Sequence, residues 1–270
     1  MNTLIEKFKS RLIKDQLSPN TVKIYCFSAY TFLNIYKRIT AQNVISFQHY
    51  LEEHYCARSA NLRIIAFNKF LTFAGKEEYK LKITKCKQAN YLDNVLTYDQ
   101  YLLFKESLSK KTDKKWYFIV WLLAATGVRI SELVQFKVED IQRGHLDVHA
   151  KGMKLRRVFI PNKVRKDLLS WLKEENIESG YIFRNYRGTP ISIRGISKGL
   201  EHEAKITGIN PHLVHPHAFR HLFARKFLEK NGDIATLADL LGHESLDTTK
   251  IYLRKTSDEQ QRMIDRIVKW

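Results

Sequence analysis

Apolar residues recur at helical spacing through the first 75 residues and predict four short helices. Leu4, Phe8 and Leu12 form the apolar face of the first helix. Ser18 and Pro19 mark the start of the second, because a serine side chain caps free N–H groups and proline suits the first helical position. Helices of this kind bury their apolar faces against one another, so a small bundle is expected.

The third and fourth helices continue this pattern. Thr40 can cap the third helix, and the fourth runs from about Ser59 to a C-terminal cap at Gly75. The apolar residues assigned to the interior of the second, third and fourth helices are Val22, Tyr25, Cys26, Ala29, Leu33, Val44, Phe47, Leu51, Leu62, Ile65, Phe70 and Leu71.

The helical periodicity is lost over 76–95, a lysine-rich stretch, and we place a linker at 86–95 within it. The sequence therefore predicts a helical domain at 1–85 and a second domain at 96–270.

The second domain is predicted to be helical around one small antiparallel sheet. A capping box at 97–100 and an apolar helix over 116–126 come first. Apolar and polar residues then alternate over 146–150, and after a turn the strand pattern resumes over 155–160. A further short strand is expected at 181–183. The predicted fold class is mainly α, with an α+β second domain.

The charge of the chain indicates its class of partner. The formal net charge is +18, of which residues 1–85 carry +8, so both domains are basic. A polyanion such as nucleic acid is the expected ligand, although a cationic surface that maintains solubility would give the same charge. No apolar run reaches the ~20 residues of a membrane span, no signal peptide is present and no CxxC pair occurs, so we expect a cytoplasmic protein with reduced thiols.

Two clusters of candidate catalytic residues lie in the first part of the second domain. Arg129 emerges at a turn after Gly127, and Glu132, three residues on, can hold its guanidinium. The alternative is a surface Arg–Glu pair. Lys151 lies in the predicted hairpin turn, where a long side chain can reach a leaving oxygen. Lys154 competes with it, and lysines are common at exposed turns.

The third cluster contains two histidines and an arginine near a helix start. His217 and Arg220 are three residues apart and lie on one helix face. His217 and His221 have the spacing of metal ligands, but Ala218 stands where the HExxH pattern requires glutamate. We therefore expect no metal, and a purely structural cluster is the alternative.

The fourth cluster, His243 and Tyr252, completes a set that is suited to phosphodiester transfer. Alone, each would be uninformative, because a single tyrosine is usually a packing residue. Together with two arginines and a lysine they supply what this reaction needs: guanidiniums that bind the phosphate oxygens, a nucleophile and an acid for the leaving oxygen. No Walker A loop is present, and a phosphotyrosine keeps the energy of the broken bond, so no cofactor is expected.

Five dispersed elements together resemble one known family. They are TGVRISEL at 126–133, AKG at 150–152 ahead of the strand RRVFIP, HAFR at 217–220, LGH at 241–243 and Tyr252. In this order they resemble the tyrosine recombinases of the phage-integrase and Xer type. The departures are mild: Ala150 stands where glycine is frequent, and Phe219 where leucine is usual.

The resemblance implies a role for each residue. The implied catalytic residues are Arg129, Lys151, His217, Arg220, His243 and Tyr252, with Glu132 supporting Arg129. In this family the arginines grip the scissile phosphate, the lysine protonates the 5′-oxygen and the tyrosine forms a 3′-phosphotyrosine. The first histidine assists proton transfer at the tyrosine, and the second hydrogen-bonds the phosphate. The free 5′-hydroxyl of a partner strand then reverses the reaction, which leads to a Holliday junction.

The family also implies an assembly on double-stranded DNA. The N-terminal domain is similar in size and helicity to a core-binding, SAM-like domain, and the two domains would close round DNA, with no room for an additional arm-binding domain. A C-terminal helix over 258–270 would dock on a neighbouring subunit, giving a dimer on one site and a homotetramer on two. Its apolar face comprises Met263, Ile264, Ile267, Val268 and Trp270. The alternative is that this helix packs on its own domain.

Possible DNA contacts and competing functions complete the expectations. Candidate DNA-contacting residues near predicted helix starts are Asn20, Lys23, Asn61, Arg63 and Arg194. We expect these residues to contact phosphates, or to be solvated, more than to read bases. The expected function is site-specific recombination, for integration or excision of a mobile element or for dimer resolution, in association with a bacterial nucleoid. The alternatives are a type IB topoisomerase and a DNA-binding regulator with a decayed site, although the complete catalytic set argues against the regulator.

Overall fold

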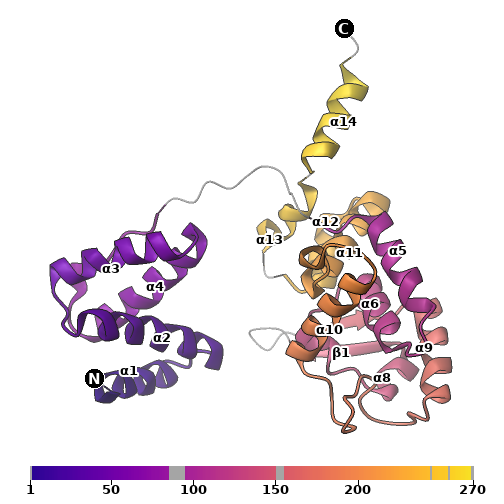
Figure 1. Cartoon of the computed structure of the whole chain (residues 1–270), viewed down its shortest axis with the longest axis horizontal. Coiled ribbons are helices and arrows are strands. Elements are labelled where there is room, and N and C mark those ends of the chain that lie inside the picture. Colours follow the sequence, from indigo (N-terminus) through magenta and orange to yellow (C-terminus); the bar gives the residue numbers. More distant parts are fainter. Residues whose placement is uncertain (1, 85–94, 150–154, 244, 255, 269–270) are drawn as a thin grey trace. The chain divides into compact units, whose positions relative to one another are not determined.

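The computed structural model of the chain confirms a mainly helical fold with one small antiparallel sheet (Figure 1). It describes residues 2–84, 95–149, 155–243, 245–254 and 256–268. Contacts divide the chain into two compact units, Met1–Gln88 and Ala89–Trp270. Most of the predicted linker, residues 86–94, lies outside the described residues.

All of the regular secondary structure in the described part of unit 1 is helical. Its elements are α1 (Asn2–Lys14), α2 (Pro19–Tyr36), α3 (Ala41–His54), α4 (Ala57–Phe73) and the 3-10 turn η1 (Glu77–Tyr79). Both predicted N-terminal caps are confirmed: the Ser18 side chain accepts from the Thr21 N–H, and the Thr40 side chain from the Asn43 N–H. Gly75 lies two residues after the end of α4, beyond the C-cap Ala74, and has φ +66°, in the left-handed region expected of a glycine that ends a helix.

Phenylalanine dominates the core of unit 1. The ring centroid of Phe67 on α4 lies 4.6 Å from that of Phe32 on α2 and 4.9 Å from that of Phe47 on α3. All three side chains are fully buried. These contacts tie three helices together through one residue of α4.

Three core assignments from the sequence are wrong. Leu4, Leu62 and Ile65 are exposed, with exposed fractions of 36%, 48% and 46%. Their neighbours Ile5 and Ile64 are buried instead. Apolar residues are adjacent at both places, so the spacing alone did not determine which of them faces the core.

Unit 2 holds the remaining described elements. They are α5 (Tyr98–Ser109), α6 (Lys115–Thr126), α7 (Ile130–Leu133), α8 (Val138–Arg143), β1 (His145–His149), β2 (Leu155–Phe159), α9 (Asn162–Glu174), α10 (Ile193–Ile206), η3 (Pro211–Leu213), α11 (Pro216–Asn231), α12 (Ile234–Leu241), α13 (Leu246–Lys250), η4 (Ile251–Leu253) and α14 (Ser257–Ile267). The capping box at 97–100 is confirmed at the start of α5.

Helix α6 is the centre of unit 2. Residues 118–123 are buried on every side of the helix, which packs against α5, α9 and α11. Its C-terminus therefore lies inside the unit, and the chain that follows it, with Arg129, starts from a fixed point beside α11.

Strands β1 and β2 form the predicted hairpin, with His145 opposite Phe159 and Val148 opposite Arg156. The hairpin turn, residues 150–154, lies outside the described residues. The strand expected at 181–183 is not formed: Tyr181 makes an isolated bridge with Lys137, and the consecutive residues Ile182 and Phe183 are both buried. Burial of consecutive side chains is incompatible with the alternation of a half-exposed strand.

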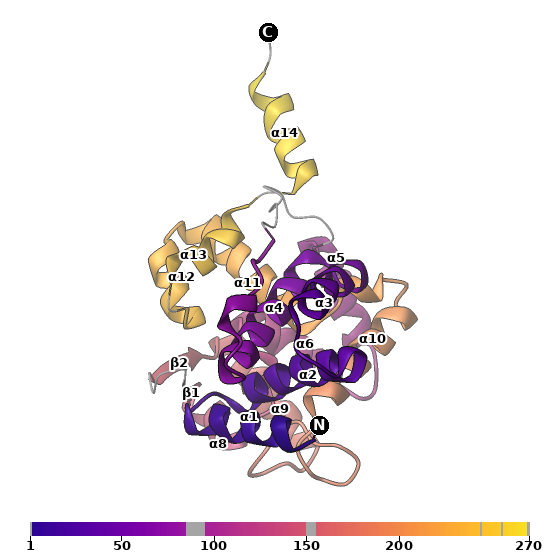
Figure 2. The same ribbon diagram turned by 90° about the vertical axis from the view of Figure 1, so that its left-hand side faces the viewer.

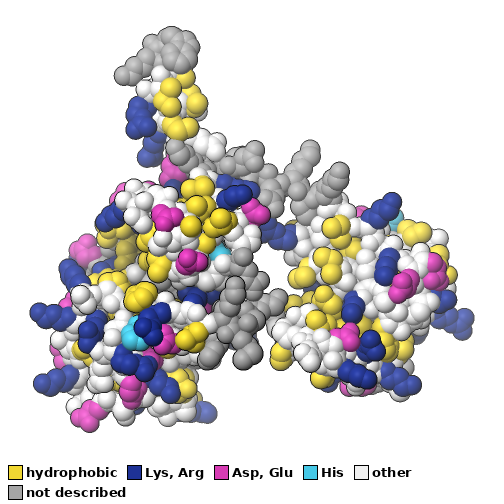
Figure 3. Space-filling model, turned by 180° about the vertical axis from the view of Figure 1, so that it is seen from behind, with side chains coloured by type: hydrophobic (Ala, Val, Ile, Leu, Met, Phe, Trp, Pro, Cys, Tyr) yellow, Lys and Arg dark blue, Asp and Glu magenta, His cyan; other side chains and the backbone are white. Residues whose placement is uncertain are grey.

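Helix α14 extends away from the rest of unit 2 in both ribbon views (Figures 1 and 2). Along it, hydrophobic side chains gather on one side and basic side chains on another (Figure 3). Ile264, Ile267 and Val268 are between 41% and 54% exposed, whereas Glu259 of the same helix pairs with Arg225 on α11. None of the helices described has the length and apolarity needed to cross a bilayer.

Candidate active site

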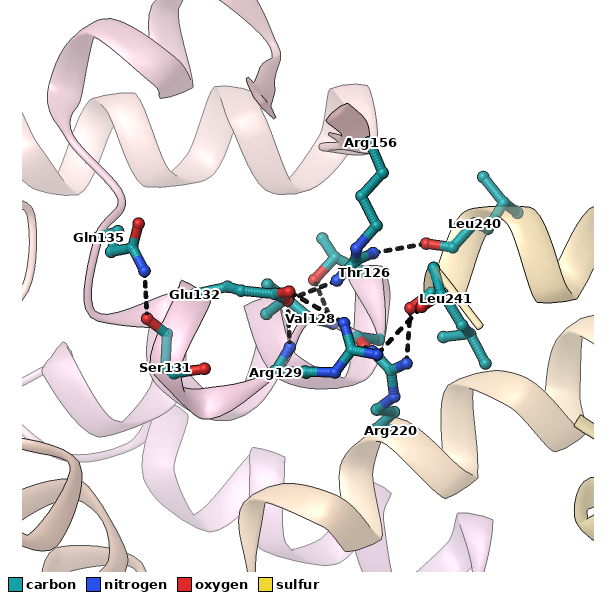
Figure 4. Close-up of polar contacts among 12 residues, drawn as sticks. Thr126, Val128, Arg129, Ser131, Glu132, Gln135, Arg156, Arg220, Leu240 and Leu241 are labelled. Carbon is teal, nitrogen blue, oxygen red and sulfur yellow. Dashed lines mark hydrogen bonds and ion pairs between the residues drawn. The ribbon is translucent and has the colours of Figure 1, made fainter. Parts of the chain in front are cut away.

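Glu132 is the centre of the first half of the site. Its carboxylate accepts from the Arg129 guanidinium (Nη1 to Oε1, 3.1 Å) and from the Arg129 backbone N–H (2.8 Å). Its Oε2 also accepts from Arg156 Nη2, and these side chains point toward one another in Figure 4. Despite burial, which alone would raise it, the pKa of Glu132 is lowered by these hydrogen bonds and charges. The predicted contact of Glu132 with Arg129 is therefore present in the structure.

Gly127 makes the turn that delivers Arg129 to this carboxylate. It ends α6 with φ +61°, and its N–H donates to the Leu123 carbonyl. A Cβ on this residue would lie 2.4 Å from Cδ1 of Phe223 on α11, so a side chain is excluded as well as unfavourable in φ. The close approach of the turn to α11 brings Arg129 toward Arg220.

Backbone carbonyls at two helix ends hold the arginines. Arg220 Nη1 donates to the Gly127 carbonyl at the end of α6, and Nη2 to the Leu241 carbonyl at the end of α12, both at 2.7 Å. Arg129 Nη2 donates to the Gly242 carbonyl (3.2 Å), and Arg156 Nη1 to the Leu240 carbonyl (2.6 Å). The C-terminal end of a helix carries partial negative charge, which favours a guanidinium there.

Arg220 is nearly inaccessible, with an exposed fraction of 2%. Burial, followed by repulsion from Arg129, lowers its pKa to about 10, while the Tyr252 hydroxyl acts in the opposite direction. The guanidinium remains charged at neutral pH, and its planar fork still has N–H donors beyond those used by the carbonyls.

His243 follows α12 and bonds to Arg220. Its Nε2 lies 3.0 Å from Arg220 Nη2, and its Nδ1 lies 2.8 Å from Thr249 Oγ1. Burial, Arg220 and Arg129 lower the pKa of His243 to about 4, so the imidazole is neutral at pH 7.

Tyr252 lies on η4 and is buried, with an exposed fraction of 8%. Its ring is stacked on His243, with centroids 6.0 Å apart, and meets His221 edge to face at 4.8 Å. The prediction that Tyr252 follows His243 on a short helical turn is therefore correct. The hydroxyl is held close enough to Arg220 to affect its pKa.

His217 lies one turn before Arg220 on α11 and is an exposed residue of that helix. Burial, Arg220 and Arg129 lower its pKa. Neighbouring His215 caps α11 by accepting the Ala218 N–H at Nδ1 (3.2 Å). Within the described ranges, no group of three or more His, Cys, Asp or Glu side chains is arranged to hold a metal.

The hairpin turn contains the predicted catalytic lysine and its competitor. Lys151 and its competitor Lys154 belong to the hairpin turn, outside the described residues. The flanking strand β2 does reach the site, because Arg156 on β2 bonds to Glu132 and to the end of α12.

The predicted DNA-contacting residues fall into two groups. Asn20 and Lys23 on α2 and Arg194 on α10 are exposed. Asn61 pairs with the backbone of Thr84 through both its amide nitrogen (2.7 Å) and its amide oxygen (2.9 Å).

Arg63, another of the predicted DNA-contacting residues, contacts two aromatic rings. Its guanidinium carbon lies 4.0 Å from the ring centroid of Tyr55 and 5.1 Å from that of Phe27. Arg63 and Asn61 therefore both have partners within unit 1.

Sequence reasoning missed Arg156 and Thr249 as parts of the site, and it considered His221 only as a possible metal ligand. For Arg156 a signal existed: it lies in the alternating pattern of β2 on the same face as Val158 and Ile160, both of which are buried. For Thr249 no periodicity was available, because its role depends on the turn that brings α13 back to His243.

Comparison with known proteins identifies a family. Residues 94–259 match the model described as the phage integrase family. The chain is 31% identical to tyrosine recombinase XerA of Pyrococcus furiosus over 97% of this chain and 93% of that protein. It is 29% identical to tyrosine recombinase XerD of Listeria monocytogenes, over 95% of each.

Solved structures agree in fold. The crystal structure of XerA recombinase matches 100% of this chain and 99% of the XerA chain, at 27% identity and a TM-score of 0.57. XerH recombinase bound to a palindromic difH substrate, in a post-cleavage complex, matches 97% of this chain and 84% of its own at 20% identity and a TM-score of 0.74. A λ integrase dimer bound to a core site matches 93% of this chain and 94% of the λ integrase chain, at 19% identity and a TM-score of 0.73.

Proposed function

The chain belongs to the phage integrase family and is a tyrosine recombinase, a DNA cleaving and rejoining enzyme, and we propose that Tyr252 is its nucleophile. The observation that carries the proposal is the convergence of four side chains from separate elements. Arg129, Arg220 and His243 meet at the ends of α6 and α12, and the ring of Tyr252 is stacked on His243. The relatives it matches are recombinases, and a topoisomerase function is not favoured.

In the proposed cleavage step, the oxygen of Tyr252 attacks the scissile phosphorus. The bond to the 5′-oxygen breaks, and a 3′-phosphotyrosine forms. Arg129 and Arg220 bind the non-bridging oxygens, whose charge grows in the transition state. The phenol needs this environment, because at an ordinary pKa near 10 only about 0.1% of it is ionised at neutral pH.

Proton transfer involves the remaining residues. His217, neutral because its pKa is lowered, accepts the proton of the phenol, and Lys151 gives one to the departing 5′-oxygen. His243 donates a hydrogen bond to a phosphate oxygen, and Glu132 holds Arg129 in position. The 5′-hydroxyl of a partner strand then attacks the phosphotyrosine, which restores a phosphodiester and frees Tyr252 without a nucleotide cofactor.

A trapping experiment tests the nucleophile. Nicked duplexes with a randomised segment lose the short strand after cleavage, so the wild-type chain is expected to accumulate as a covalent adduct, and sequencing the trapped ends identifies the DNA site. Tyr252→Phe is expected to abolish the adduct while gel-shift affinity stays within about twofold. An adduct that persists in Tyr252→Phe would show that another residue is the nucleophile.

For assembly, we propose a dimer on one DNA site and a homotetramer on two, linked by α14. The exposed apolar residues of α14 support docking in a neighbouring subunit, since exposed apolar patches commonly mark such contacts. Deletion of residues 258–270 is expected to weaken cooperative binding and synapsis while the melting of the remaining chain is retained. Unchanged cooperativity in a gel-shift titration would contradict this role.

A further inference from the structure

Thr249 contacts His243 on the side of the ring away from the arginines. It lies on α13, its exposed fraction is 0%, and its Oγ1 is 2.8 Å from His243 Nδ1. The other ring nitrogen, Nε2, is 3.0 Å from Arg220 Nη2. The imidazole is thus held between a guanidinium that can only donate and a hydroxyl that can donate or accept.

This arrangement determines where the proton of the neutral ring lies. Because Arg220 can only donate, Nε2 of His243 accepts with its lone pair. The ring proton is therefore on Nδ1 and is donated to Thr249 Oγ1. The phosphate contact proposed above requires the opposite tautomer, because a phosphate oxygen only accepts and would face the lone pair of Nε2.

We propose that Thr249 is a positioning residue that allows His243 to change tautomer when phosphate enters the site. The inference rests on the proposed function of His243. When the phosphate takes up the N–H groups of Arg220, His243 takes one proton from solvent at Nε2 and releases one from Nδ1 to solvent, so the ring stays neutral. The Thr249 hydroxyl then rotates and donates to Nδ1, and Nε2–H donates to the phosphate.

A threonine suits this task better than other hydrogen-bonding side chains. A carboxylate would only accept and would fix the Nδ1–H tautomer, whereas an ammonium would only donate and would fix the other. A hydroxyl satisfies Nδ1 in both states without a change of position. Before phosphate enters, the ring is neutral at pH 7, because burial beside Arg220 and Arg129 lowers the pKa of His243 to about 4.

The kinetic test uses Thr249→Val, which keeps the shape and removes the hydroxyl, and Thr249→Ser, which keeps the hydroxyl. On the nicked duplex recovered by trapping, we expect Thr249→Val to slow adduct formation about 10-fold or more, since a buried ring nitrogen is left without a partner. DNA affinity should stay within about twofold, and Thr249→Ser should restore the rate. Thr248→Val, an exposed change on the same helix, is the matched control and should react like the wild type.

The spectroscopic test is independent of cleavage. Histidine ¹⁵N spectra of the free wild-type chain, with His243 assigned through His243→Gln, should show Nδ1 protonated. Saturating inorganic phosphate should shift the proton to Nε2, and in Thr249→Val this shift should be diminished or lost. The His243 role itself is checked by adduct formation in His243→Gln.

The outcomes separate the two proposals. If the wild type forms no adduct, or if His243→Gln reacts at the wild-type rate, the proposed function is wrong. Neither result contradicts the Nδ1-protonated form of His243 in the phosphate-free protein. Wild-type rates in Thr249→Val overturn the role of Thr249. Equal losses in Thr249→Val and Thr249→Ser, with lowered melting in both and unchanged ¹⁵N tautomers, would show that Thr249 only packs.

Discussion

Arg156 and Glu132 form a buried ion pair that joins the β hairpin to the arginine turn after α6. The two side chains are 7% and 11% exposed, and Arg156 Nη2 donates to Glu132 Oε2. Arg156 also packs against Gly242, where a Cβ would lie 2.3 Å from its Cδ. One strand residue thereby contacts both the Arg129 and the His243 segments of the site.

Loss of this pair should be costly. Removing Arg156 takes one of two guanidinium partners from the buried Glu132 carboxylate, and we expect Arg156→Met to lower the free energy of unfolding by about 3 kcal/mol. Arg157→Met is the control, because Arg157 pairs with Asp147 at an exposed position and should change stability much less. Denaturant unfolding measures both. Equal losses in the two variants would contradict a buried role for Arg156.

The turn at Gly127 should not accept a side chain. Gly127→Ala adds a methyl group that meets Phe223 in a backbone conformation that disfavours L-residues, so a loss of about 3 kcal/mol is expected. Gly232→Ala separates the two causes: Gly232 has φ +69° at the end of α11 with no atom within 4 Å of the added group. The free energy of unfolding of Gly232→Ala should fall by about 1 kcal/mol. A loss as small as this in Gly127→Ala would show that Phe223 moves aside without cost.

Stability should depend on pH through His221. Burial, and then the charges of His217, His215, Arg220 and Arg225, lower its pKa to about 4, whereas an unfolded histidine has a pKa near 6.5. Below pH 6.5 the unfolded chain therefore binds a proton that the folded chain refuses. Stability should fall from pH 6.5 toward pH 4.

His221→Phe isolates this contribution, because a phenyl ring can keep the edge-to-face contact with Tyr252 and takes up no proton. The decrease in melting temperature between pH 7 and pH 5 should be smaller in His221→Phe than in the wild type. His202→Phe, at an exposed position of α10, should leave the pH profile unchanged. Parallel profiles for His221→Phe and the wild type would contradict the prediction.

Local signals in the sequence were sufficient for much of the fold. The caps at Ser18, Thr40 and Thr97 each depend on a side chain and a backbone N–H three residues away, and all are present. The β hairpin likewise follows from the alternation of apolar and polar residues within each of two neighbouring strands. Leu62 and Ile65 were misassigned because adjacent apolar residues satisfy the helical spacing equally well.

For the site, the sequence supplied the residue types, and the fold supplied the contacts. That Arg129 meets Glu132 could be predicted, since three residues separate them on one turn. That Arg220 bonds to Gly127 and Leu241 could not, because these contacts join segments 93 and 21 residues apart. Arg156 and Thr249 were overlooked for the same reason: their partners are brought together by tertiary packing.

The carbonyl oxygens at the ends of α6 and α12 place partial negative charge beside the arginines that are proposed to bind phosphate. These oxygens are not protonated in acid, unlike carboxylates. A pocket that fixed its arginines with several carboxylates would lose part of that support in acid and would cancel part of its own positive potential. Peptide oxygens do neither, and no single side-chain substitution removes them. The electrostatic potential offered to a phosphate should therefore persist across the range of acidity in which the surrounding histidines change state.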